Sequence, residues 1–490
     1  MASPLLISGA RTQSATCAPA LASTARPWAT SAVLLLGDTL ALMAAGYLGY
    51  FLWSQVNNSI GIGFFFQLAP ALAVSLVIYA SAGLYPAAGI GPVEELRRVT
   101  LSITAVCLVS IAAIFFSKDA DLYSRGVLLT SWLAAVVLAP LQRALVRALF
   151  SSRPWWGVPV LVLGAGDAGR MLAASLGSNP RCGLKPVAYL SDDPETDRRR
   201  DDGVEVAGPL SSAAAIATSL RVKQAIIAIP RIEKQQLLDV VERLGAPFTR
   251  LIIVPDMFGI ATLWISPKDL AGVLGLEVRQ NLLMPINRFW KRILDLAIGA
   301  ALGLLALPLI AVAAFWIKRV SPGPAFYMQE REGWAGSRLR VWKLRTMHVN
   351  AEALLLDHLR ADPEAQREWR RCFKLKKDPR VIPLIGALLR RSSLDELPQL
   401  WSVLKGEMSL VGPRPFPYYH LEQFGPSFRA LRRRVLPGLT GLWQVDSRSD
   451  GDLRAQETLD TYYIRNWSVW LDLHILARTV HTVVSGKGAC

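Results

Sequence analysis

The sequence has few of the residues that bind transition metals or form disulfide frameworks. It contains five cysteines and five histidines, scattered through the chain without CxxC or HExxH spacing. A disulfide framework or a structural zinc site needs such residues at short, regular spacings. The sequence therefore argues against a disulfide-stapled fold and against a metal held by imidazole or thiolate ligands.

Acidic residues are scarce relative to basic ones. The chain has 38 Asp and Glu residues against 54 Lys and Arg residues, which gives a formal net charge of +16. A basic excess can indicate a nucleic-acid partner, but no DNA- or RNA-reading motif is present. The basic residues instead cluster beside apolar runs and after Lys318, as expected near a cytoplasmic leaflet or phosphorylated substrates. We therefore expect a lipid membrane, and no nucleic acid, among the partners.

The first residues lack a recognisable targeting signal. Residues 1–30 are rich in Ala, Ser and Thr, and they contain no short apolar core followed by a small-residue cleavage site. This composition predicts a disordered lead over residues 1–30.

Long apolar runs, by contrast, are abundant, and 52% of the residues are hydrophobic. A helix that crosses a bilayer needs about 20 predominantly apolar residues. Runs near this length occur at residues 32–53, 62–84, 99–116 and 127–149. Together they predict a four-helix transmembrane bundle.

Positive charges set the expected orientation of this bundle. The first connection carries none, whereas basic residues occur in the second connection and at the end of the bundle: Arg97, Arg98, Arg143, Arg147 and Arg153. The positive-inside rule then places both ends of the bundle in the cytoplasm. We therefore expect a multi-pass protein of the cytoplasmic membrane whose soluble domains face the cytoplasm.

An α/β pattern follows the bundle. A run of Val and Leu typical of a buried strand leads into Gly164, Gly166 and Gly169, and a helical run comes next. In a Rossmann-like unit such glycines hold a nucleotide phosphate, and Asp192 or Asp193 would bind a ribose. The three glycines are therefore candidate cofactor-binding residues. The alternative is an inherited fold with an empty or regulatory site, since no Tyr-x-x-x-Lys pair for redox chemistry is present.

Two adjacent acids lie among arginines in the C-terminal half. Asp395 and Glu396 follow Arg390, and Arg414 stands between two prolines shortly afterwards. One carboxylate can attack phosphorus while the other holds a divalent cation or moves a proton, and arginines pair bidentately with phosphate oxygens. The alternative is an ordinary helix start, with Ser393 as N-cap and the acids in the first turn.

The motifs around these acids resemble those of the bacterial sugar transferases, the monotopic phosphoglycosyl transferases, in their long form. They occur in family order from about Asn287 to the C-terminus. The matching pieces are Lys-Arg-Ile-Leu-Asp at 291–295, Gln-Glu-Arg-Glu-Gly at 329–333, Lys-Leu-Arg-Thr-Met at 343–347, and the segments 393–399, 405–415 and 437–444.

The resemblance implies a reaction and a nucleophile. Such enzymes transfer hexose-1-phosphate from a UDP-hexose to undecaprenyl phosphate and release UMP, the first membrane step of O-antigen, capsule or exopolysaccharide synthesis. Asp395 matches the nucleophile that becomes an aspartyl phosphosugar. Glu396 matches the second acid, expected to bind Mg²⁺ or to act as a local base. Residues 368–380 are similar to those of undecaprenyl-phosphate galactosephosphotransferases, so galactose is the first expectation for the hexose and glucose the second.

The resemblance also supplies the remaining site candidates. Lys343, Arg390 and Arg414 match basic positions expected to bind phosphates, and Arg448 and Asp460 fall at further matching positions. For the basic residues the alternative is a solvated surface charge. The long form of the family implies a homodimer in the bacterial inner membrane.

A fifth apolar run, at residues 296–317, contains Pro308 near its middle and has two basic residues at each end. Equal charge at both ends draws them to the same membrane face, and proline permits a sharp bend. A re-entrant membrane helix satisfies both observations. The predicted order is therefore a disordered lead (1–30), a four-helix transmembrane bundle (31–152), a Rossmann-like α/β domain (153–270), a linker (271–287) and a mainly helical transferase domain (288–490) with a re-entrant helix at about 291–317.

Two further questions stay open at the level of sequence. The aromatic-rich segment 467–484 fits an interfacial membrane helix or ordinary core packing.

Two other functions also compete with the transferase. A non-catalytic scaffold for polysaccharide assembly predicts a dispensable acid pair, and a membrane-anchored NAD-dependent nucleotide-sugar enzyme predicts a Tyr/Lys couple that the sequence does not show.

Overall fold

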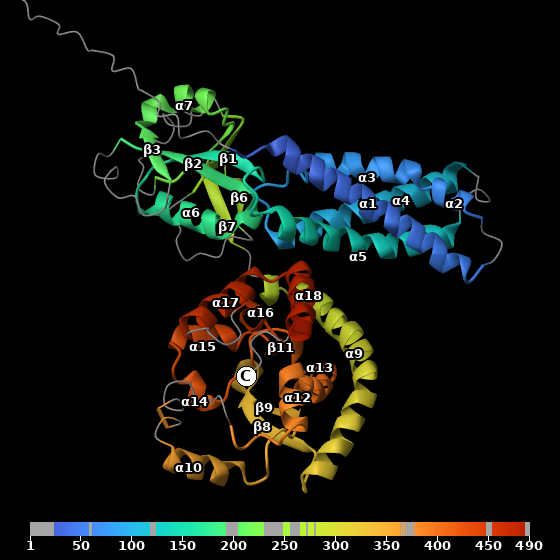
Figure 1. Cartoon of the computed structure of the whole chain (residues 1–490), viewed down its shortest axis with the longest axis vertical. Coiled ribbons are helices and arrows are strands. Elements are labelled where there is room, and N and C mark those ends of the chain that lie inside the picture. The colour runs from blue at the N-terminus through green and yellow to red at the C-terminus, as the bar shows by residue number, and fades with distance from the viewer. Residues whose placement is uncertain are drawn as a thin grey trace, which may run out of the picture. The chain divides into compact units, whose positions relative to one another are not determined.

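The computed structural model describes residues 24–57, 61–117, 124–192, 204–229, 248–254, 265–270, 273–278, 281–362, 364, 366–367, 375, 378–446 and 453–485. Contacts within the chain define two compact units, Met1–Phe258 and Gly259–Cys490. The first unit contains a helix bundle and a parallel sheet (Figure 1). The second unit contains the acid pair. The structure is thus of mixed α and α/β class, as predicted.

Long apolar helices dominate the first unit. Its helices of membrane-spanning length are α1 (Pro27–Ser54), α4 (Pro92–Ser117) and α5 (Arg125–Phe150). A fourth helix of this kind among the described residues, α9 (Pro285–Val320), belongs to the second unit. The composition and length of these helices indicate a membrane protein.

The predicted second transmembrane helix is shorter than expected. The apolar run at 62–84 forms α2 (Gly63–Phe66) and α3 (Ala69–Ser81), and the 13 residues of α3 rise only about 20 Å. That length falls short of a hydrocarbon core of about 30 Å. The physical reason is local: Pro70 occupies the first turn of α3 and restarts the helix. The prediction of four spanning helices in the bundle is therefore corrected to three among the residues described there.

A buried charge network holds the bundle together. Arg143 contacts Asp38 at 2.6 Å and Glu95 at 2.8 Å, and Arg147 contacts Glu95 at 2.8 Å. Arg147 also donates to the carbonyl oxygen of Arg181 at 2.6 Å, which connects the bundle to the α/β domain. These buried side chains can remain charged because each one is paired with a side chain of opposite charge.

This network changes the basis of the predicted orientation. Arg143 and Arg147 are neutralised inside the bundle, so they are poor markers of a cytoplasmic connection. Among the basic residues used for the prediction, Arg97, Arg98 and Arg153 remain outside the network, and the orientation stays a prediction that depends on them.

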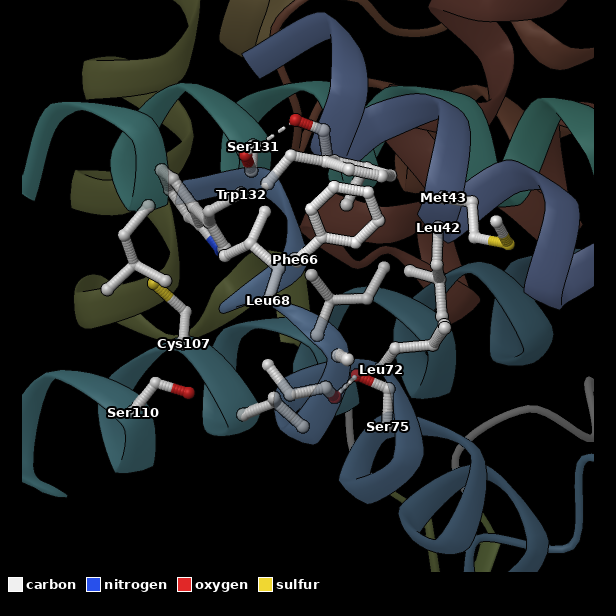
Figure 2. A pocket seen from close by; sticks show the side chains of 18 residues that line it. Leu42, Met43, Phe66, Leu68, Leu72, Ser75, Cys107, Ser110, Ser131 and Trp132 are labelled. Atoms are coloured by element: carbon white, nitrogen blue, oxygen red, sulfur yellow. Dashed lines mark hydrogen bonds between the residues drawn. The ribbon is translucent and has the colours of Figure 1, made fainter. Parts of the chain in front are cut away.

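An apolar cavity of about 220 Å³ lies among the helices of the bundle. Figure 2 shows Leu68, Leu72 and Trp132 among the side chains around it. Ser75 and Ser131 also line it, but they donate their hydroxyl groups to the carbonyl oxygens of Ala71 and Gly46. The cavity is therefore suited to hydrocarbon rather than to a polar ligand.

The α/β domain of the first unit contains a five-stranded parallel sheet in the order β3-β2-β1-β4-β5. This order matches the first five strands of a Rossmann fold and confirms the predicted parallel sheet. Helix α6 (Asp167–Ser178) follows the first strand through the glycine turn, and α7 (Ala213–Ser219) follows the third. The strands are β1 (Val158–Leu163), β2 (Leu184–Leu190), β3 (Glu205–Gly208), β4 (Gln224–Ile227) and β5 (Arg250–Ile253).

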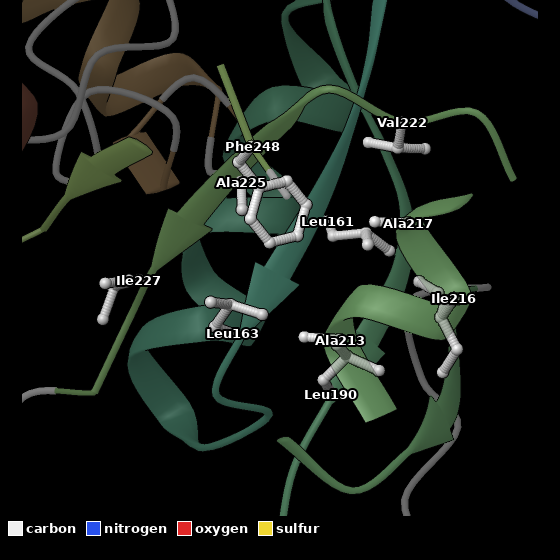
Figure 3. Packing of buried hydrophobic residues seen from close by; sticks show 11 residues of the cluster. Leu161, Leu163, Leu190, Ala213, Ile216, Ala217, Val222, Ala225, Ile227 and Phe248 are labelled. Atoms are coloured by element: carbon white, nitrogen blue, oxygen red, sulfur yellow. The ribbon is translucent and has the colours of Figure 1, made fainter. Parts of the chain in front are cut away.

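The core of this domain forms where alternate strand residues meet α7. Leu161 and Leu163 of β1 pack with Leu190 of β2 and Ile216 of α7, and Phe248 packs in the same cluster (Figure 3). All six residues of β1 are buried, as expected for the central strand of a parallel sheet covered on both faces.

The second unit is mainly helical and contains short strand pairs. Its strands are β6 (Ile265–Leu270) with β7 (Val273–Val278), β8 (Phe326–Glu332) with β9 (Arg338–Leu344), and β10 (Ser409–Val411) with β11 (Gly438–Thr440). Its remaining helices are η5 (Asn281–Leu283), η6 (Trp334–Gly336), α10 (Ala351–Ala361), α12 (Ile385–Ser392), η7 (Leu394–Gln399), α13 (Leu400–Lys405), α14 (Tyr418–Leu421), α15 (Pro426–Arg432), α16 (Leu442–Asp446), α17 (Leu453–Asn466) and α18 (Val469–Ser485).

Helix α9 runs unbroken for 36 residues through Pro308 and curves along its length in Figure 1. One side of α9 packs on the rest of the unit through small residues such as Gly299 and Ala313. On its other side, Leu304 and Leu305 are 72% and 70% exposed. An apolar outer face of this kind suits lipid. The re-entrant geometry stays a prediction, since a continuous helix is compatible with re-entry and with spanning.

The aromatic-rich segment near the C-terminus packs mainly in the core. Trp467, Leu471 and Ile475 have exposed fractions of 2%, 2% and 0%. Of the two open alternatives, core packing therefore accounts for these residues. Val480, near the end of α18, is 66% exposed, and other large exposed apolar side chains of this unit occur on α9, α12 and α13 among other elements.

Candidate active site

The acid pair lies on a tight 3₁₀ turn rather than at the start of an α-helix. α12 ends at Ser392, Ser393 adopts a left-handed conformation with φ of 57°, and the chain continues directly into η7, which carries Asp395 and Glu396. The side chain of Ser393 does not cap η7. The alternative prediction, a capped α-helix with the acids in its first turn, is therefore wrong. The 3₁₀ turn instead places both acids beside β9.

Glu396 is held by two cations from distant parts of the chain. Its Oε1 atom accepts hydrogen bonds from Lys343 Nζ of β9 at 2.7 Å and from Arg414 Nη2 at 2.9 Å. Burial alone would raise the pKa of Glu396, but Arg414 and Lys343 lower it to about 2. Glu396 is therefore ionised at any physiological pH, and it fixes the two cations in place.

Asp395 has the opposite electrostatic character. Burial, together with the neighbouring charge of Glu396, raises the pKa of Asp395 to about 6, against the lowering effect of Lys343, Arg390 and Arg414. Among the described residues, no hydrogen-bond donor or ion-pair partner contacts its carboxylate. Two adjacent carboxylates thus differ in pKa and in availability, which is a mark of functional sites. Asp395 is the carboxylate that is available to react.

A third basic residue, Arg331 of β8, lines the small cavity beside Glu396 together with Lys343 and Arg414. Burial and the charge of Arg414 lower the pKa of its guanidinium, so an added anion would be favourable here. Arg331 belongs to the motif at 329–333, but no role was predicted for it. Its position inside that motif was the available signal.

Asp460 requires a correction. It was expected to lie among the phosphate-binding residues, but its side chain is 1% exposed and accepts a hydrogen bond from Arg432 Nη1 at 2.5 Å. Arg432 in turn donates to the carbonyl oxygen of Arg414 and lies 4.5 Å from the centre of the Phe416 ring. Asp460 is thus connected to the site through Arg432, a residue that sequence reasoning missed.

The other predicted residues differ in their placement. The charge of Arg390, near the end of α12, lowers the pKa of Asp395, so Arg390 belongs with Lys343, Arg414 and the acid pair. Arg448 lies outside the described residues, and its predicted contact with phosphate stays a prediction.

The glycine turn of the α/β domain has a clear structural role. Gly164 has φ of 110°, and a Cβ atom on Gly169 would approach the Gly164 carbonyl oxygen to 2.0 Å, so the strand-to-helix turn itself requires both glycines. Asp192 Oδ1 accepts a hydrogen bond from the Leu210 amide at 2.9 Å. Asp193 lies outside the described residues. The predicted binding of a cofactor by Gly164, Gly166 and Gly169 stays untested.

The acid pair provides a partial donor set for a divalent cation. No cluster of three or more His, Cys, Asp or Glu side chains suited to a metal occurs among the described residues. Mg²⁺ commonly takes only one or two protein carboxylates and completes its shell with waters and substrate phosphates. The unpaired Asp395 and the second oxygen of Glu396 fit that mode of binding, so they do not contradict the predicted Mg²⁺.

Together, an available carboxylate, a clamped carboxylate and surrounding cations, in a unit bearing a long apolar helix, define a class: membrane-associated enzymes that act on phosphate esters. Comparison with known proteins identifies the family. The model of the bacterial sugar transferase family matches residues 286–486, and that of a CoA-binding domain matches residues 80–255. The chain belongs to the bacterial sugar transferase family.

Relatives match along most of the chain. The UDP-galactose-lipid carrier transferase of Erwinia amylovora is 32% identical over 401 residues, which cover 81% of this chain and 82% of that protein. The undecaprenyl-phosphate galactose phosphotransferase of Salmonella typhimurium is 31% identical, with coverage of 81% and 82%. The UDP-glucose:undecaprenyl-phosphate glucose-1-phosphate transferase of Escherichia coli is 29% identical, with coverage of 92% and 94%.

Proposed function

We propose that this protein transfers hexose-1-phosphate from a UDP-hexose to undecaprenyl phosphate, with Asp395 as the nucleophile. The observation that carries the proposal is the unequal acid pair: Asp395 is unpaired, while Glu396 is clamped by Lys343 and Arg414. Relatives named for this reaction on galactose and on glucose support the substrate class.

The reaction proceeds in two displacements at one phosphorus atom. A carboxylate oxygen of Asp395 attacks the sugar-bearing phosphate, a new O–P bond forms, and the bond to the UMP phosphate breaks so that UMP leaves with the electron pair. A phosphate oxygen of undecaprenyl phosphate then attacks the same phosphorus, and the bond to Asp395 breaks. One carboxylate can thus serve a soluble donor and a lipid acceptor in turn.

The cations supply the charge that this chemistry needs. Lys343, Arg414 and Arg331 would contact phosphate oxygens and offset their charge as phosphorus is transferred. The cavity beside Glu396 measures only about 10 Å³, about the space of one water, so incoming phosphate oxygens compete with Glu396 for Lys343 and Arg414. Mg²⁺ held by Glu396 would add neutralisation of the donor diphosphate.

The membrane location follows from the exposed apolar surface. Leu384, Leu388 and Trp401, around α12 and α13, are 84%, 52% and 59% exposed, in addition to the apolar face of α9. Such side chains favour the interface of a bilayer, where the lipid phosphate lies. We place the protein in the bacterial inner membrane with its soluble parts facing the cytoplasm, α9 as a re-entrant helix, and a homodimer as the family resemblance implies.

A panel of UDP-sugar donors tests the proposed reaction and the identity of the sugar together. Full-length protein with Mg²⁺ and undecaprenyl phosphate is expected to release UMP from UDP-galactose first and UDP-glucose second, since relatives at 31% and 29% identity carry these two names. UMP is measured for each donor, with UDP-N-acetylglucosamine as the contrasting donor. Absence of UMP from every donor would favour the scaffold function instead.

The pH dependence provides a further prediction. Attack requires the ionised form of Asp395, so with its pKa raised to about 6 the rate of UMP release should fall as the pH drops below 6, approaching tenfold per pH unit. The measurement is kcat/KM for the donor in single turnovers without acceptor, which avoids titration of the lipid phosphate. Because Arg390 lowers this pKa, Arg390→Gln should move the midpoint upward. A flat profile between pH 5 and 7 would contradict the assignment.

A further inference from the structure

A second cavity occurs in the Gly259–Cys490 unit, with a volume of about 250 Å³. It lies at the start of α9 and is lined by η5, η6 and the segment that precedes β11. None of its lining residues belongs to the cavity beside Glu396. The proposed reaction therefore leaves it without a role.

Four basic side chains and one acid line this cavity. The acid, Asp295, and the lysine, Lys291, are already occupied: Lys291 Nζ contacts Asp472 at 2.7 Å, and Asp295 Oδ1 accepts from the amide of Leu410 at 3.1 Å. Lys291 Nζ also lies 3.9 Å from Asp295 Oδ1, so one ammonium faces the two carboxylates of Asp472 and Asp295. The other charged groups that line the cavity are three arginines, which outnumber the one negative charge left over in this cluster.

The three arginines have no carboxylate partner among the described residues. Arg288 donates from Nε to the carbonyl oxygen of Leu282 at 2.9 Å. Arg292 donates to the carbonyl oxygens of Val403 and Leu404 at 2.6 and 2.7 Å. Bonds to neutral carbonyls orient a guanidinium without cancelling its charge. Both side chains therefore bring uncompensated positive charge to the cavity.

The third arginine, Arg434, adds to this excess of positive charge in the cavity. Arg434 is exposed, and no side-chain hydrogen bond or ion pair of Arg434 occurs within the described part of the chain. Three guanidinium groups around one cavity repel one another unless an anion is present, and phosphate is the anion that arginine matches best in geometry.

The apolar lining and the surroundings narrow the identity of that anion. Leu282, Trp334 and Leu436 line the same cavity. Phe289 and Trp290, in the adjoining turn of α9, are 57% and 54% exposed, as expected for aromatic residues at a membrane interface. The volume lies below the roughly 300–1,000 Å³ of a site for a complete drug-sized ligand. A head group with a tail outside the cavity fits this combination.

We propose that this cavity binds the phosphate head group of an anionic membrane phospholipid, with Arg288, Arg292 and Arg434 as its ligands. The acyl chains would lie along the exposed apolar side of α9. Basic pockets beside membrane helices recognise anionic lipids by the same electrostatics. The site is separate from the acid pair and does not depend on the proposed sugar transfer.

The test compares lipid binding by the full-length chain and two variants. Arg288→Gln/Arg434→Gln removes two of the three charges, whereas Arg338→Gln removes one charge from β9 at a side chain that is 79% exposed. Native mass spectrometry counts phosphatidylglycerol and phosphatidylcholine bound to each protein released from mixed-lipid nanodiscs. Elution volume and thermal midpoint in detergent without added lipid verify folding.

Wild type and Arg338→Gln are expected to retain phosphatidylglycerol in preference to phosphatidylcholine. The double variant should bind phosphatidylglycerol more weakly by about fivefold for each lost arginine. Equal retention by the double variant, or no preference between the lipids, would overturn the proposal. A titration with inorganic phosphate distinguishes a lipid phosphate from free phosphate as the ligand. Displacement of the lipid only at a great excess of phosphate supports a lipid site. Equal affinity for free phosphate would overturn the proposal.

Discussion

Asp395→Asn is expected to abolish UMP release and the covalent hexose-phosphate adduct. The amide has the shape of the carboxylate but cannot act as a nucleophile toward phosphorus, and loss of a covalent nucleophile costs roughly 10³-fold or more in rate. The substitution should leave the fold intact, because Asp395 has no side-chain partner to lose among the described residues, and the contacts of Lys343 and Arg414 with Glu396 do not involve it.

The measurement is intact-protein mass after incubation with UDP-hexose in the absence of undecaprenyl phosphate. Wild type should gain the mass of one hexose phosphate, and Asp395→Asn should gain none. Asp357→Asn is the matched control, since it makes the same chemical change on α10 at a side chain that is 75% exposed, and it should behave as wild type. An adduct on Asp395→Asn would place the nucleophile elsewhere.

Local features of the fold were predictable because short sequence segments encode them. The buried run before Gly164 predicts β1, and the glycines predict the turn into α6, since only they allow φ of 110° and the close approach at Gly169. The second bundle helix was predicted too long because average hydrophobicity outweighed the effect of Pro70, which restarts the helix at α3.

Long-range partners were not predictable in the same way. Asp38 and Arg143 are 105 residues apart, and Lys343 and Glu396 are 53 residues apart. The sequence marks each as a charged residue, but only packing of the helices and of β9 against η7 determines which acid meets which base. For this reason Arg143 and Arg147 looked like flanking charges, and Asp460 looked like a phosphate contact.

Arg432→Met is expected to be the most destabilising single change near the site. Arg432 is 8% exposed and supports both the Asp460 carboxylate and the carbonyl oxygen of Arg414. Its removal leaves a buried acid without its cation, which typically costs about 3–5 kcal/mol. The thermal midpoint in detergent should fall accordingly, and transfer activity should fall with it.

The double variant Arg432→Met/Asp460→Leu separates stability from positioning. Replacing both members of a buried ion pair by apolar side chains often restores stability, so the thermal midpoint should recover. The carbonyl oxygen of Arg414 would still lack its donor, and the loop that presents this guanidinium to Glu396 and to the donor phosphates would lose a support. A displacement of about 1 Å in a positioning group can lower the rate roughly 10²-fold. The kcat of the double variant should therefore remain low although its thermal midpoint recovers. Recovery of both quantities would mean that Arg432 only stabilises the fold, whereas recovery of stability alone would identify Arg432 as the residue through which Asp460 positions Arg414.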